Sequence, residues 1–189
     1  MPIRVWQAVW RRLAAGAWAL LIGLCLLADA RANPQVQQMA LERTAEGLYL
    51  NARLGLGATP DVEDALVRGV PLYFVWQADV TRSRWYWADK RLVSAVRVLR
   101  LAYQPLTRQW RLSIGAFTRN YASLEETLDV LRRSTRWRIG DRPSGDADQH
   151  YVDFGFRLDT KELPRPLQIG MGNQDTWDLE LERQVQLRN

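Results

Sequence analysis

The chain has 189 residues, a net charge of +5, one cysteine and one histidine. This length holds about one domain and a short leader, and a single histidine with a single cysteine cannot build a zinc site of ordinary composition. Residues 1–32 carry four arginines and one aspartate, so the rest of the chain has a net charge of only +2. That balance lacks the basic excess of a nucleic-acid-binding protein, and we expect no nucleic-acid partner.

The first 32 residues follow the plan of a secretory signal peptide. Arg4, Arg11 and Arg12 form its positive end, and the run from Leu13 to Leu27 contains no charged residue. This apolar run is shorter than the roughly 20 residues that span a bilayer. We therefore expect cleavage after residue 32, which also removes the only cysteine, and a single β-rich periplasmic domain over residues 33–189. An uncleaved anchor, which would keep the domain at the membrane, is the alternative.

The domain begins with a predicted β-hairpin. Residues 36–43 and 48–56 flank a turn-prone segment, and leucines recur at alternate positions in the second run. Thr59 and Pro60 then suit the N-cap and the first position of a short helix over residues 60–68. Residues 72–81 alternate apolar and polar side chains, which predicts a strand with one buried face.

Further strands are predicted over residues 84–88, 92–103 and 109–115. Ser123 and Glu126 have the spacing of a capping box, which predicts a second helix over residues 124–133. A polar loop over 141–149 precedes predicted strands at 151–158, 167–171 and 177–187. Many consecutive strands with two short helices predict a mainly β (α+β) fold, either an antiparallel β-sandwich or an open barrel.

Motifs that would indicate catalysis or cofactor binding fail on inspection. His150 is the sole histidine and is expected in a surface loop. Asp146 and Asp148 begin a calcium-like spacing, but glycine and glutamate are missing where an EF-hand loop requires them. No serine lies in a nucleophile elbow. Gly55 and Gly57 resemble a dinucleotide loop, yet Pro60 stands in the third glycine's place. We predict no catalytic residue, metal or cofactor.

An aromatic segment with basic neighbours is the candidate interaction surface. Trp85, Tyr86 and Trp87 are consecutive, and Arg84 and Arg91 lie on either side of them. Tryptophan, tyrosine and arginine are the preferred anchors of protein interfaces. The alternative is that the two tryptophans fill the core of the sheet.

The order of these features resembles domain of unknown function family 4390, a family of exported proteobacterial proteins. The resemblance is carried by residues 71–74, 85–87, 106–110, 117, 123–126, 158–164 and 177. It implies no activity and no site residues. Genes of this family often lie beside a membrane sensor kinase of the nitrogen-regulation type, which favours a sensory or envelope accessory role.

The leading hypothesis is therefore a non-enzymatic binding or accessory domain, with a membrane or envelope protein as its partner. One alternative is an enzyme that acts on cell-wall glycan through carboxylates such as Asp153 and Asp159, because glycoside hydrolysis requires two acids. Another alternative is a purely structural envelope protein.

Overall fold

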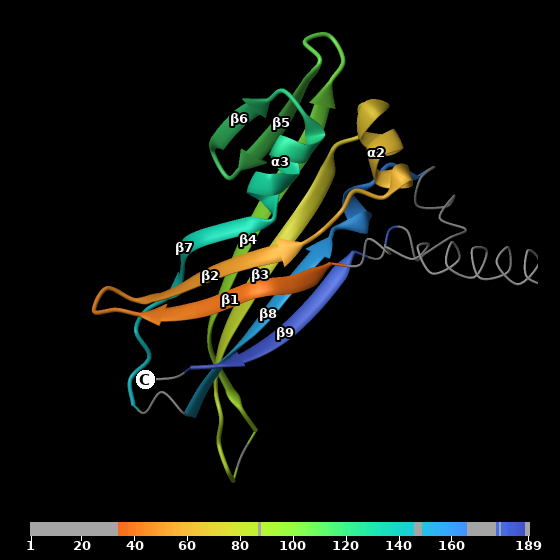
Figure 1. Ribbon diagram of the computed structural model, residues 1–189. Helices are drawn as coiled ribbons and strands as arrows, with labels where there is room; N and C mark the ends of the chain where they lie inside the picture. Colours follow the sequence, from red (N-terminus) through yellow and green to blue (C-terminus); the bar gives the residue numbers. More distant parts are fainter. Residues whose placement is uncertain (1–33, 87, 146–148, 166–176, 178, 188–189) are drawn as a thin grey trace, which may run out of the picture. The chain divides into compact units, whose positions relative to one another are not determined.

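The computed structural model describes residues 34–86, 88–145, 149–165, 177 and 179–187 (Figure 1). This part of the chain forms nine strands in two antiparallel sheets, neither of which closes into a barrel. Two short α-helices and one 3-10 turn, η2 (Thr160–Glu162), complete it. The predicted mainly β fold with two short helices is confirmed. None of the helices in these ranges is long and apolar enough to cross a bilayer.

The smaller sheet has three strands in the order β1-β2-β7. They are β1 (Gln35–Arg43), β2 (Leu48–Gly55) and β7 (Arg133–Gly140). The predicted hairpin is β1 and β2, and the residues of β2 alternate between buried and partly buried along its whole length. This alternation places one face of the small sheet against the core.

The larger sheet has six strands in the order β6-β5-β4-β3-β8-β9. In chain order they are β3 (Leu72–Arg82), β4 (Lys90–Gln104), β5 (Gln109–Ile114), β6 (Phe117–Tyr121), β8 (His150–Leu158) and β9 (Glu180–Gln186). The central strand β3 pairs with β4 on one side and with β8 on the other, over nearly its full length. The predicted strands at 72–81, 92–103, 109–115 and 151–158 are confirmed.

Both predicted helices form at their predicted caps. The Thr59 side chain accepts a hydrogen bond from the Val62 amide at the start of α2 (Pro60–Val67). The Ser123 side chain accepts from the Glu126 amide at the start of α3 (Leu124–Leu131). In each case the cap satisfies one of the amides that a first helical turn leaves without a partner.

The hydrophobic core lies between the two sheets. Trp76 of β3 is fully buried there and makes edge-on ring contacts with Phe154 of β8 at 5.4 Å and with Trp137 of β7 at 6.4 Å. These contacts join a residue of the small sheet to two strands of the large one. Gln77 and Asp79 alternate with the core residues Trp76 and Ala78 along β3, so they lie on the face of the large sheet that is turned away from the core.

Some local predictions are wrong, and some elements were missed. The described residues of the 84–88 segment (84–86 and 88) do not form a strand, because β3 pairs with β4 directly and this segment is the connection between them. Helix α3 ends at Leu131 and not at residue 133, since β7 begins at Arg133 and pairs with β2. Strands β6 and β7 were not predicted at all. The predicted strand at 167–171, Asp146 and Asp148 lie outside the described residues.

His150 is also not in a surface loop. It is the first residue of β8, it pairs with Arg82 of β3, and only 1% of its surface is exposed. Burial alternates along β8, and His150 has the same parity as the core residues Val152 and Phe154, so it belongs to the buried set of this strand.

Candidate functional site

The connection between β3 and β4, residues 83–89, presents aromatic side chains to solvent, and we call it the hairpin tip. Trp85 is 93% exposed and Tyr86 is 68% exposed. Their ring centroids lie 4.9 Å apart at an interplanar angle of 69°, so the two rings form one edge-to-face pair. Figure 1 shows this hairpin extending beyond the neighbouring strands. Trp85 therefore does not fill the core. Its exposure fits the other interpretation, in which this residue contributes to an interaction surface.

A carboxylate holds the hairpin tip in shape. Asp89 accepts a hydrogen bond through Oδ1 from the backbone amide of Arg84 at 3.1 Å, which closes the loop on itself. Its other oxygen, Oδ2, accepts from the hydroxyl of Tyr151 on β8 at 2.7 Å. One side chain thus closes the loop and ties it to the neighbouring strand.

The base of the hairpin tip has further attachments to the segment before β8. The backbone amide of Ser83 donates to the carbonyl of Gln149 at 2.8 Å. The Arg82 guanidinium donates to the side-chain oxygen of Gln149 at 3.0 Å. These bonds fix the base of the loop, and a fixed loop loses less entropy than a mobile one when it binds a partner.

Not all of the predicted surface residues lie together. Arg84 and Trp85 belong to the hairpin tip, whereas Trp87 lies outside the described residues. Arg91 lies on β4, and its Nε approaches Asp79 Oδ2 of β3 at 3.5 Å. Arg91 therefore faces the open side of the large sheet rather than the aromatic pair. Sequence inspection missed Asp89 and Tyr151, because their contact joins residues that are far apart in the chain.

Other exposed apolar residues stand apart from this pair. Leu106 is completely exposed at the β4–β5 turn, and Phe117 is exposed on β6. Among the described residues neither side chain contacts an aromatic ring, and single exposed apolar side chains of this kind are common on protein surfaces. The hairpin tip differs because two adjacent aromatic rings are exposed together and the loop that carries them is fixed.

The two carboxylates considered for glycan chemistry do not form a pair. Asp153 lies within β8, and Asp159 follows its last residue and accepts a hydrogen bond from the Lys161 amide at 3.2 Å. Six residues of strand separate their backbones by roughly 20 Å, whereas glycosidases need about 5–10 Å between carboxyl groups. Among the described residues, no three histidine, cysteine, aspartate or glutamate side chains are grouped to hold a metal ion.

The Asp89 contact gives the hairpin tip a defined pH dependence. The hydrogen bonds from Tyr151 and from the Arg84 amide hold the pKa of Asp89 below its ordinary value of 3.8. The same contact with Asp89 raises the pKa of Tyr151 above its ordinary value of 10.0. A lowered carboxyl pKa means that the contact is fully formed above pH 3.8 and is lost as the pH falls through the lowered value. The raised pKa keeps the Tyr151 hydroxyl protonated to a higher pH than that of an ordinary tyrosine.

We expect the amide signal of Arg84 in NMR spectra to titrate with a midpoint below 3.8. Tyr151→Phe removes the hydrogen-bond donor that lowers the pKa of Asp89 most. It should therefore move this midpoint up towards the ordinary pKa of an aspartate. Tyr49→Phe, which alters another partly exposed tyrosine, should leave the midpoint unchanged. A midpoint at 3.8 in the wild type that Tyr151→Phe does not change would show that the contact does not form in solution.

These features define a class: a domain of two packed antiparallel β-sheets with a fixed, projecting aromatic hairpin. The chain belongs to the family described as domain of unknown function (DUF4390), whose profile matches residues 31–186. The family resemblance seen in the sequence is thereby confirmed. No curated protein and no solved structure matches the chain significantly.

Proposed function

We propose that the domain is a non-enzymatic accessory domain that acts outside the cytoplasmic membrane and binds an envelope protein through the hairpin tip. The observation that carries the proposal is the exposed Trp85–Tyr86 pair on a loop fixed by Asp89. Large aromatic surfaces held in water are unfavourable for an isolated domain, and their burial is a major source of binding free energy. A fixed aromatic hairpin therefore suits recognition of a protein surface.

The expected export of the domain and the proposed membrane partner are consistent with each other. The leader over residues 1–32 has the pattern of an export signal, which supports a location in the cell envelope. A membrane sensor kinase is the partner that the gene neighbourhood of the family favours. Basic side chains beside the aromatic pair, Arg84 and Lys90, would complement an acidic rim on such a partner.

The test is chemical crosslinking of the tagged full-length protein in living cells, followed by mass spectrometry of the recovered complexes. We expect one membrane protein to be recovered with the wild type and to be lost with Trp85→Ala. Leu106→Ala is the matched control, because it removes an equally exposed apolar side chain from a different hairpin turn. Recovery of the same protein with Trp85→Ala at wild-type yield would contradict the proposed surface.

A further inference from the structure

The small sheet has a hollow of about 420 Å³ on the face that is turned away from the core. Three consecutive residues of each strand line it: residues 38–40 of β1, 51–53 of β2 and 133–135 of β7. Ala52 and Ser134 are buried on the core side, where Arg97 of β4 donates to Ser134 Oγ at 3.3 Å. None of the described residues of the large sheet lines the hollow, so it does not lie between the sheets.

Two arginines face each other in this hollow. Arg53 lies between the buried residues Ala52 and Leu54 of β2, so its side chain leaves the outer face of the sheet. Arg133 of β7 is its direct register partner, which places their Cβ atoms about 4.5–5.5 Å apart. Like charges directly opposite each other destabilise a sheet. A negatively charged ligand between the two guanidinium groups would remove this repulsion.

Neither arginine is neutralised by the described residues. Arg53 has no ion-pair or hydrogen-bond partner among them. Arg133 Nη2 lies 3.6 Å from Oδ2 of Asp129, which is longer than a hydrogen bond, and both side chains are about half exposed. The other oxygen of Asp129 accepts from Arg132 at 3.3 Å. The residues that line the hollow include no carboxylate.

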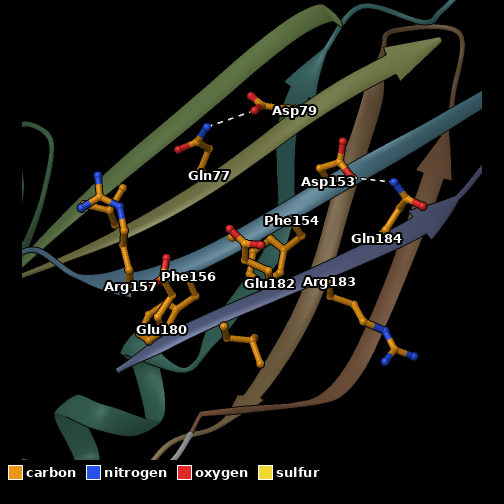
Figure 2. Close-up of a pocket in the computed structure, with 13 residues that line it drawn as sticks. Gln77, Asp79, Asp153, Phe154, Phe156, Arg157, Glu180, Glu182, Arg183 and Gln184 are labelled. Carbon is orange, nitrogen blue, oxygen red and sulfur yellow. Dashed lines mark hydrogen bonds between the residues drawn. The ribbon is translucent and has the colours of Figure 1, made fainter. Parts of the chain in front are cut away.

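The hollow on the outer face of the large sheet has a different composition (Figure 2). Asp79 and Asp153 are register partners there, and each accepts a hydrogen bond from a glutamine amide, at 3.0 Å and 2.8 Å. Arg91 approaches Asp79 at 3.5 Å, and Arg157 also lines this hollow. Charges of both signs are therefore present in the hollow of the large sheet, whereas the charged residues of the hollow in the small sheet are all arginines.

A β-bulge adds neutral hydrogen-bond donors to the hollow of the small sheet. The register of β2 and β7 shifts between residues 50 and 52, so Thr135 and Arg136 both stand opposite Asn51. Arg136 has a φ of 46°, which is rare for a residue other than glycine, and its backbone amide donates to Asn51 Oδ1 at 2.7 Å. This bond orients the Asn51 amide, and its Nδ2 has no acceptor among the described residues. Asn51 and Thr135 therefore offer an N–H and an O–H donor beside the two arginines.

The small sheet as a whole is basic. Its strands contain five arginines, one in β1, one in β2 and three in β7, and a single carboxylate, Glu42. Outside the hollow, the guanidinium of Arg136 lies over the ring of Tyr49 at 5.1 Å, and Arg138 is paired with Asp141. An anion that approaches the outer face of this sheet therefore meets a positive potential.

We propose that this hollow binds a phosphate group. A guanidinium offers a planar fork of N–H donors that matches phosphate oxygens, and Arg53 and Arg133 would bind the group from two strands at once. A phosphate monoester carries a charge of about −1.5 to −2 at neutral pH, which balances two arginines, whereas a carboxylate balances only one. Asn51 Nδ2 and the Thr135 hydroxyl would donate to its remaining oxygens. The site is separate from the hairpin tip and does not depend on the function proposed for it.

The test is an NMR titration of the purified full chain with sodium phosphate at neutral pH, with the ionic strength held constant by sodium chloride. We expect saturable shifts of the Asn51 side-chain amide and the Thr135 backbone amide, with a dissociation constant on the order of 1 mM. Sodium acetate should bind at least about tenfold more weakly, because it carries one charge. Dihexanoylphosphatidic acid identifies the source of the phosphate: tighter binding than inorganic phosphate indicates a lipid headgroup, and equal or weaker binding indicates a soluble phosphate.

Two double variants test the residues. Arg53→Gln/Arg133→Gln should weaken phosphate binding at least about tenfold, whereas Arg68→Gln/Arg119→Gln removes the same charge outside the small sheet and should not. Phosphate should also raise the melting temperature of the wild type above its value in sodium chloride of equal ionic strength, and this rise should be lost in the first variant. The proposal is overturned if phosphate causes no saturable shifts at Asn51, or if acetate binds as tightly. It is equally overturned if Arg53→Gln/Arg133→Gln binds phosphate as the wild type does.

Discussion

Trp76→Ala should lower the free energy of unfolding by about 3–5 kcal/mol, the usual loss when a fully buried tryptophan is truncated. Trp76 is 1% exposed and contacts aromatic rings of both sheets. These rings are Phe154 and Phe156 of β8 in its own sheet and Trp137 of β7 in the small sheet. The cavity would open at the junction of the two sheets. A domain of this size has a total stability of about 5–15 kcal/mol, so this one change would remove a large part of it.

Urea denaturation followed by circular dichroism measures this loss. Trp76→Phe is the matched control, because it keeps an aromatic ring in the same place. The indole Nε1 of Trp76 has no hydrogen-bond partner among the described residues, so phenylalanine sacrifices no hydrogen bond and should destabilise less than alanine. A loss below about 1 kcal/mol for Trp76→Ala would mean that the two sheets do not pack on this residue.

Replacing both aromatic residues of the hairpin tip, Trp85→Ala/Tyr86→Ala, should weaken the affinity for the captured partner by more than about 100-fold. Each side chain at the centre of an interface commonly contributes 2 kcal/mol or more, which corresponds to about 30-fold in affinity. The stability of the domain should change by less than about 0.5 kcal/mol, because both side chains are exposed.

Isothermal titration of the purified partner with each variant measures this effect, and the unfolding curve of the same sample measures stability. Leu106→Ala and Phe117→Ala control for the loss of exposed apolar surface at other places. The hairpin tip is not the binding surface if the double variant binds the partner as tightly as the wild type does. The same conclusion follows if Leu106→Ala weakens binding to the same degree.

The parts of the fold that were predicted correctly have strong local signals. Strand β3 alternates apolar and polar side chains, and both helices begin at side chains that cap them, Thr59 and Ser123. In each case the pattern lies within a few residues, and local energetics are sufficient to specify the structure.

The errors arise where pairing between distant segments decides the structure. The Trp85–Tyr86–Trp87 segment has the composition of a strand, but because Arg82 pairs with Lys90, Trp85 and Tyr86 lie in a turn. The arginines after α3 suit a helix end, yet Arg133 begins a strand because it pairs with Arg53 of β2. Neither register is visible in the local sequence.

The same reason explains why the pairing of Asp79 with Asp153 was missed. Asp79 and Asp153 become neighbours only through the register between β3 and β8, and the sequence instead suggested pairing Asp153 with Asp159. The role of Asp89 likewise depends on a contact with Tyr151 across two strands. The hairpin tip itself was found because its unusual composition, three consecutive aromatic residues with basic neighbours, is a local feature.

Site-specific photocrosslinking in living cells tests most directly the claim that the hairpin tip binds an envelope protein. A photoreactive phenylalanine analogue placed at position 85 should form a covalent adduct with a single envelope protein, and the same analogue at position 106 should not. Both positions are fully or almost fully exposed on hairpin turns, so accessibility does not distinguish them. An adduct from position 106 but none from position 85 would contradict the account, because the partner would then contact the other end of β4.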